Sequence, residues 1–245
     1  MSTLSAQHWD AKVKMDPYCI EDLYFWKNNL NSIKVRDCFL FNKPQRFAYS
    51  DASATGCGSV ITLNEDCVCH KLWEPSECSK SSTWRELAAF DFSLESFGPI
   101  LKGSLVKWFT DNQTAARIIG VGSMKLDLHR LTIKMFQFCA EHSIRLEVQW
   151  IPRTENEKAD YVGRLIDFYD WQITHDLFSS LEELEGPHTV GCFANYYTAK
   201  LPRFFSRFWN PGASGIDFFA QELRSENCLV VPPVSLALRP VFGLF

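Results

Sequence analysis

The sequence predicts an α/β protein: one five-stranded mixed sheet flanked by helices, with a helical lead-in and an irregular C-terminal tail. Three closely spaced segments of alternating apolar and polar residues indicate an antiparallel meander. Two later alternating segments are separated by segments with helical periodicity, which favours parallel strands joined by helices. Apolar residues make up 46% of the 245-residue chain, enough for a substantial core.

The elements follow the order β-β-β-α-β-α-α-β-α after a short helix in the lead-in. Residues 46–63 predict two strands, and three more are predicted at 68–73, 104–110 and 145–151. Apolar residues at helical spacing predict helices at 20–30, 81–97, 113–119, 126–142 and 156–165, with a further one at 170–184. Breakers bound several of them: Gly98-Pro99 stops the second helix, and Gly120 and Gly122 break the third.

Charge and cysteine content restrict the function classes. The net charge is −4 and the isoelectric point is near 5.9, so no broad basic surface for clamping nucleic acid is expected. The nine cysteines are scattered without a repeating frame, which favours free thiols in a reducing compartment. No signal pattern or run of about 20 apolar residues occurs, so we expect no membrane and a cytoplasmic or nuclear location.

Four acidic residues stand at informative places. Asp51 ends the first predicted strand and Asp111 ends the fourth, which are natural central neighbours in a mixed sheet. Glu86 and Asp160 lie on helices that can reach the same edge. Each also has an ordinary interpretation: Asp51 as a turn residue, Glu86 as part of a capping box, Asp111 as a helix cap and Asp160 as a solvated helix acid.

The ordinary interpretations fit less well together than singly. Two carboxylates about 4 Å apart repel by ~4 kcal/mol at an effective dielectric near 20, so a proton or a cation must lie between them. Oxygen-only ligands suit Mg²⁺ or Mn²⁺, and four acids can hold two such ions for an in-line displacement at phosphorus. Acidic and basic residues are nearly balanced over 46–165, so bound metal would supply much of the attraction for phosphate.

Ordered motifs over residues 46–165 resemble the type 1 ribonuclease H domain of retroelement polyproteins, most like those of DIRS-type (tyrosine-recombinase) retrotransposons. The matching segments are Ser50-Asp51-Ala52-Ser53 with Gly56 and Gly58, Thr-Trp-Arg-Glu-Leu-Ala at 83–88, Phe109-Thr110-Asp111-Asn112, Ile151-Pro152, and 156–160. The resemblance implies a ribonuclease H-like domain at 46–168, a connection-like lead-in at 1–45, and a degraded, truncated retroelement tail at 169–245.

The resemblance also implies a site and an activity. Asp51, Glu86, Asp111 and Asp160 would be catalytic ligands of two Mg²⁺ or Mn²⁺ ions. The reaction would be endonucleolytic cleavage of the RNA strand of an RNA–DNA hybrid, leaving 5′-phosphate and 3′-hydroxyl ends. The implied partners are this hybrid and an upstream reverse transcriptase domain, with no small-molecule cofactor. The residues expected to touch nucleic acid are Ser53, Gly56, Cys57, Asn112, Gln113 and Arg153.

Some positions depart from the family pattern and leave alternatives open. The loop Arg153-Thr154-Glu155 lacks the His that many members carry there. A weak or inactive nucleic-acid-binding or structural module is therefore one alternative, and a DNA-directed nuclease or integrase of the same fold is another. The tail resembles a methyltransferase-like region but lacks both functional positions, at Gly191 and Val231, so we expect packing there rather than methyl transfer.

Two further features are candidate sites. Cys67, Cys69 and His70 with Cys78 could suggest zinc, but they lack a Cys-x₂-Cys knuckle. The aromatic run 204–209 could stack bases beside its arginines, although buried packing or a partner surface is the favoured interpretation.

Overall fold

The computed structural model describes residues 12, 14–33, 43–63, 66–165, 172–233 and 236. The chain divides into two compact units, residues 1–41 and 42–245. In the first unit, helix α1 spans Pro17–Ile33 and includes the segment predicted to be helical. Several of its apolar side chains are exposed, among them Leu23, Tyr24 and Trp26. Across the described part of the chain, every helix is too short or too polar to cross a membrane.

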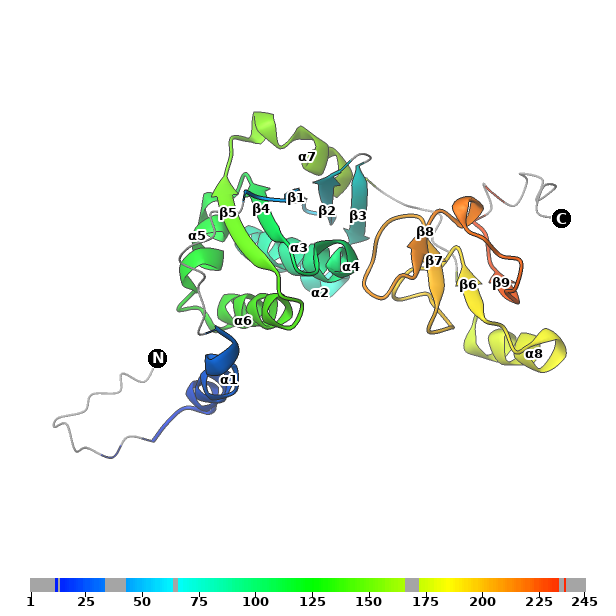
Figure 1. Ribbon diagram of the computed structural model, residues 1–245, viewed down its shortest axis with the longest axis horizontal. Coiled ribbons are helices and arrows are strands. Elements are labelled where there is room, and N and C mark those ends of the chain that lie inside the picture. Colours follow the sequence, from blue (N-terminus) through cyan, green and yellow to red (C-terminus); the bar gives the residue numbers. More distant parts are fainter. Residues whose placement is uncertain are drawn as a thin grey trace. The chain divides into compact units, whose positions relative to one another are not determined.

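The second unit is built on the predicted five-stranded mixed sheet (Figure 1). The strand order is β3-β2-β1-β4-β5. The first three strands pair antiparallel, whereas β4 runs parallel to both β1 and β5. This confirms the predicted fold class and places β1 and β4 side by side at the centre. The strand bounds are β1 Arg46–Ala52, β2 Gly56–Thr62, β3 Cys67–Leu72, β4 Leu105–Thr110 and β5 Arg145–Trp150.

Helices cover both faces of this sheet. Helix α7 packs over β1, β2 and β3 on one face, and α3 packs against β1 and β2 on the other, with α6 packed against α3 (Figure 1). Helix α5 continues through Gly120 and ends at Gly122, whose φ is +79°, so only the second of the two predicted breakers acts. The helix bounds are α2 Pro75–Cys78, α3 Ser82–Ser96, α4 Gly98–Leu101, α5 Gln113–Val121, α6 Leu126–Glu141, η1 Arg153–Glu155 and α7 Glu157–Gly163.

The core between α3 and the sheet is aromatic and fixes the centre of β1. The rings of Phe90 in α3 and Trp108 in β4 have centroids 4.1 Å apart, and both side chains are almost fully buried. The Trp108 indole N–H donates to Ser50 Oγ at 2.9 Å. A buried tryptophan that finds a hydrogen-bond partner is held in one orientation. Ser50, and with it the next residue Asp51, is therefore held at a defined place on the sheet.

Residues 172–233 contain a second, smaller sheet where the sequence predicts an irregular tail. Its four short strands are all parallel, in the order β8-β7-β6-β9. A small core of Val190, Cys192, Phe205 and Phe218 lies against it. The bounds are α8 His175–Glu185, β6 Val190–Cys192, β7 Phe204–Ser206, β8 Gly215–Ile216, η2 Phe218–Ala220 and β9 Cys228–Val230.

The segment after β7 joins this part of the chain to the edge of the larger sheet. Trp209 forms a parallel bridge with Cys69, and its backbone N–H donates to the Val68 carbonyl oxygen at 2.9 Å. The His70 and Phe208 rings lie edge to face, with centroids 5.9 Å apart. The outer edge of β3 is therefore covered at this point.

Candidate active site

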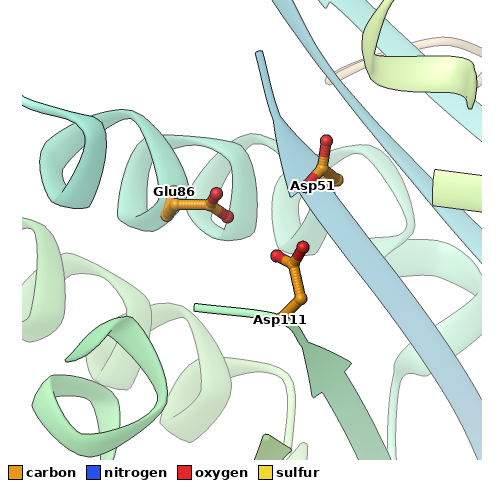
Figure 2. A group of neighbouring side chains, drawn as sticks. All are labelled: Asp51, Glu86 and Asp111. Carbon is orange, nitrogen blue, oxygen red and sulfur yellow. The ribbon is translucent and has the colours of Figure 1, made fainter. Parts of the chain in front are cut away.

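Two strand ends and one helix bring three acidic side chains together. Strands β1 and β4 are parallel neighbours in which Ser50 lies opposite Thr110, so Asp51 and Asp111 follow at the same sheet edge. Glu86 comes from α3, which packs under β1. Each of the three carboxylates offers an oxygen, and these oxygens all lie within 4.8 Å of one another. Figure 2 shows Glu86 and Asp111 directed toward each other and toward Asp51.

The structure excludes the ordinary interpretations of two of these acids. The N-cap of α3 is Ser81, whose hydroxyl accepts from the Trp84 N–H, so Glu86 is not part of a capping box. The N-cap of α5 is Asn112, whose Oδ1 accepts from the Ala115 N–H at 2.9 Å, so Asp111 is not the cap. Neither acid is therefore required to end or begin a helix.

Burial and like charge make the site costly when all three acids are ionised. Asp51 is 5% exposed and Glu86 is 8% exposed. Burial, together with the charges of Asp111 and Asp160, raises the pKa of Asp51 to about 6. Burial raises the pKa of Glu86 to about 9, with further contributions from Asp51 and Asp111, while a backbone hydrogen bond from Ala52 opposes the shift. A proton or a bound cation would relieve this repulsion.

The donor set suits a hard divalent cation. The Glu86 Oε2 atom is buried and has no hydrogen-bond partner. Buried polar atoms are normally paired, so an orphan atom aimed among other carboxylates is what a metal ion would satisfy. All three side chains offer oxygen only, which suits Mg²⁺, Mn²⁺ or Ca²⁺ better than zinc. The residues present therefore fit a metal site made by Asp51, Glu86 and Asp111.

Asp160 lies close to this group without being part of it. Its Oδ1 atom forms ion pairs with Arg153 and, at 2.9 Å, with Arg164 four residues later in the chain. Its negative charge nevertheless contributes to the raised pKa of Asp51. The fourth predicted ligand is thus occupied by two guanidinium groups, and its role as a ligand stays a prediction.

Helix α7, which carries Asp160, is held against the sheet by backbone contacts. A Cβ atom on Gly58 would lie 2.4 Å from the Gly163 backbone nitrogen, so the helix can approach β2 this closely because Gly58 has no side chain. At the start of α7, the buried Asn156 donates from Nδ2 to the Ser50 carbonyl oxygen at 3.0 Å. These two contacts fix α7 beside Asp51.

A cavity of ≈ 260 Å³ opens over the three acids. Of the residues predicted to touch nucleic acid, Ser53, Asn112 and Arg153 line it. Gly56 and Cys57 are instead buried in β2, and Gln113 is exposed on α5 outside the cavity lining. A Cβ atom on Gly56 would lie 2.5 Å from the Lys71 carbonyl oxygen. The absence of a side chain at Gly56 therefore allows β2 and β3 to lie close together. The full lining is Asp51, Ala52, Ser53, Glu86, Asp111, Asn112, Arg153 and Arg164.

Arg164 is a charged residue of this lining for which the sequence analysis predicts no role. The signal that could have found it is its position four residues after Asp160, which places both side chains on the same face of α7. The candidate zinc site at Cys67, Cys69, His70 and Cys78 gains no support. Within the ranges that the structure describes, the acidic trio is the one group of metal-ligating side chains close enough to hold an ion. Cys69 is buried, and its thiol donates to Ser93.

Comparisons with known proteins find similarity to solved structures. No family model and no curated protein matches the sequence. RNase H1 from the halophilic archaeon Halobacterium salinarum NRC-1 is 15% identical with a TM-score of 0.38, over 48% of this chain and 92% of that one. LC11-RNase H1 in complex with an RNA/DNA hybrid is 19% identical with a TM-score of 0.36, over 48% of this chain and 93% of that one.

A viral protein also matches. The foamy viral protease-reverse transcriptase in complex with an RNA/DNA hybrid is 13% identical with a TM-score of 0.36, over 52% of this chain and 22% of that one. At these values the likeness assigns no activity. The ribonuclease H-like fold rests on the strand order of the chain itself, β3-β2-β1-β4-β5, with its mixed directions.

Proposed function

We propose that the chain is a metal-dependent ribonuclease H that hydrolyses the RNA strand of RNA–DNA hybrids. The observation that carries the proposal is the convergence of Asp51, Glu86 and Asp111, with oxygens within 4.8 Å, at the ends of two central parallel strands. The sequence motifs around these acids, which resemble those of type 1 ribonuclease H domains, support the same proposal. The proposal also includes a DIRS-type retroelement origin, an upstream reverse transcriptase partner and the domain limits 46–168.

The acids would hold the metal and the arginines would meet the phosphate. Asp51, Glu86 and Asp111, joined by Asp160 once its ion pairs open, would bind two Mg²⁺ or Mn²⁺ ions. Such ions, when bound, lower the pKa of a water molecule and neutralise charge on the phosphate. Arg153 and Arg164 line the same cavity and present N–H donors that match phosphate oxygens. Preference for RNA would come from contacts to 2′-hydroxyl groups.

The test is cleavage of a hybrid with a labelled RNA strand, in the presence of Mg²⁺ or Mn²⁺. The wild-type chain should produce fragments with 5′-phosphate ends. Asp111→Asn should lower the rate by more than about 100-fold, because loss of a direct ligand exceeds the 10–100-fold cost of losing an outer-shell partner. Asp127→Asn, an exposed acid at the start of α6, is the matched control and should retain full activity. Equal rates for Asp111→Asn and wild type would refute the proposal.

A second candidate is a module that binds nucleic acid without cleaving it. The ion pairs that occupy Asp160 favour it, since they leave three acids rather than four for metal. Duplex DNA and single-stranded RNA offered beside the hybrid separate the activities. Hybrid binding without cleavage, together with no rise in melting temperature on adding Mn²⁺, would favour the module. Cleavage of duplex DNA instead would favour a DNA-directed nuclease.

A further inference from the structure

The small parallel sheet has the topology at which α/β proteins form ligand sites. Strand β6 is central, with β7 on one side and β9 on the other. The chain therefore leaves β6 toward one edge through β7 and β8, and later returns to its other side through β9. In open parallel sheets, ligands bind outside the carboxyl ends of the strands at such a reversal of strand order.

A cavity of ≈ 550 Å³ lies at this place. Its lining includes the residues that directly follow the carboxyl ends of the strands: Phe193 after β6, Arg207 after β7, Asp217 after β8 and Val231 after β9. The edge strand β3 of the larger sheet contributes the segment 70–72 to the lining. The volume is within the 300–1,000 Å³ that is usual for sites that take small molecules.

The backbone at two of these strand ends is strained. Phe193 has φ 61° and Asp217 has φ 56°, and the described residues include one other non-glycine residue with positive φ, Ser143. Such conformations are energetically costly and cluster at ligand sites. Both residues directly follow a strand end and line the cavity.

The lining chemistry points to a planar, anionic ligand. Tyr196, Tyr197 and Phe219 line the cavity although they are 37%, 53% and 48% exposed. Exposed aromatic rings around a cavity offer faces on which a flat ring can stack. Arg207 is exposed at the same cavity, with its guanidinium 4.9 Å from the Phe208 ring centroid. Asp217 is also exposed and can accept hydrogen bonds from hydroxyl or amino groups.

We propose that this cavity binds a nucleobase together with its phosphate. Stacking on the exposed aromatic side chains would hold the base, Arg207 would pair with the phosphate, and Asp217 would accept from the sugar or the base. A free nucleotide and a base within a single strand share this chemistry. The sheet register places the cavity wall near the acids, since Asp51 pairs with Gly58 and Gly58 with His70. Asp51 and His70 are therefore two strand spacings apart, a distance of about 10 Å. The proposal does not depend on cleavage of hybrids.

The test measures binding by the full 245-residue chain in buffer with EDTA, so that no hydrolysis can occur. The probes are a labelled single-stranded oligonucleotide, the same oligonucleotide with abasic sites, and adenosine monophosphate. Phe219→Ala should weaken binding about 5- to 150-fold, the usual cost of removing a ring that stacks on a base. Phe136→Ala removes a ring of α6 that is 39% exposed, and as the matched control it should leave binding unchanged.

Each outcome either tests the proposal or shows whether the ligand is a free nucleotide or a base within a strand. Binding of the oligonucleotide but not of the mononucleotide assigns the cavity to a strand, and tight binding of both assigns it to a free nucleotide. Equal binding of the abasic and normal oligonucleotides overturns the proposal, as do equal effects of Phe219→Ala and Phe136→Ala or the failure of both the oligonucleotide and the mononucleotide to bind. If Phe219→Ala melts at a lower temperature than wild type, Arg207→Gln provides the second variant and should weaken binding of the phosphate-bearing probes.

Discussion

Replacing Glu86 with Gln should stabilise the metal-free protein at neutral pH, although it removes a proposed ligand. Glu86 is 8% exposed, and burial raises the pKa of its carboxyl group from 4.5 to about 9. In the unfolded chain this group loses its proton near pH 4.5, whereas the folded chain holds the proton until about pH 9. The free energy of unfolding therefore falls as the pH rises through this window.

The magnitude follows from the width of the window. Between pH 4.5 and pH 7, a span of roughly 2.5 pH units, the free energy of unfolding falls by about 3 kcal/mol. Gln has nearly the same shape and no proton to lose, so Glu86→Gln should regain this amount. For a chain of this length, about 3 kcal/mol corresponds to a rise in melting temperature of roughly 6–12 °C.

The assay is thermal unfolding in EDTA between pH 5 and pH 8. The difference in melting temperature between Glu86→Gln and wild type should grow with pH and almost vanish at pH 5. Glu141→Gln, an exposed acid at the end of α6, should melt like wild type at every pH. A difference independent of pH, or a variant less stable than wild type at pH 7, would refute the reasoning that burial raises this pKa.

Three further predictions test the metal site and the helix beside it. Mn²⁺ at 100 times its dissociation constant should stabilise the wild type by about 2.7 kcal/mol but leave the melting temperature of Glu86→Gln nearly unchanged. Gly58→Ala should destabilise the fold by about 1–3 kcal/mol through its clash with Gly163, whereas Gly120→Ala has open space on α5 and should be neutral or stabilising; urea unfolding measures both. Arg164→Ala should strengthen Mn²⁺ binding about two- to fivefold by calorimetry, because it removes an exposed cation from the cavity; weaker binding would contradict this.

The sequence predicted the larger sheet well because its strands are long enough to show their pattern. Strand β1, with Phe47 and Tyr49 alternating with smaller residues, and strand β5 were found within one or two residues of their observed ends. The same pattern placed Asp51 and Asp111 at strand ends, and the parallel pairing of β1 and β4 then brings them together. The alternation of apolar and polar residues thus predicted both the fold class and the central residues of the candidate site.

The smaller sheet and the details of the site could not be predicted in this way. Strands β6 to β9 are two or three residues long, too short for alternation to distinguish a strand from a turn. The contact of Gly58 with Gly163 joins residues far apart in the chain, and nothing local distinguishes these glycines from turn residues. The ion pair of Asp160 with Arg153 depends on how η1 is placed beside α7, which a single sequence does not specify.

The contact between Trp209 and the edge strand β3 has a practical consequence. An open edge strand presents unpaired N–H and C=O groups on which a strand from another copy can add. The Trp209 N–H occupies the Val68 carbonyl at this edge. We expect a shortened protein that lacks Trp209 to expose this edge and to self-associate through it, so the segment around Trp209 protects the larger sheet from pairing with another copy.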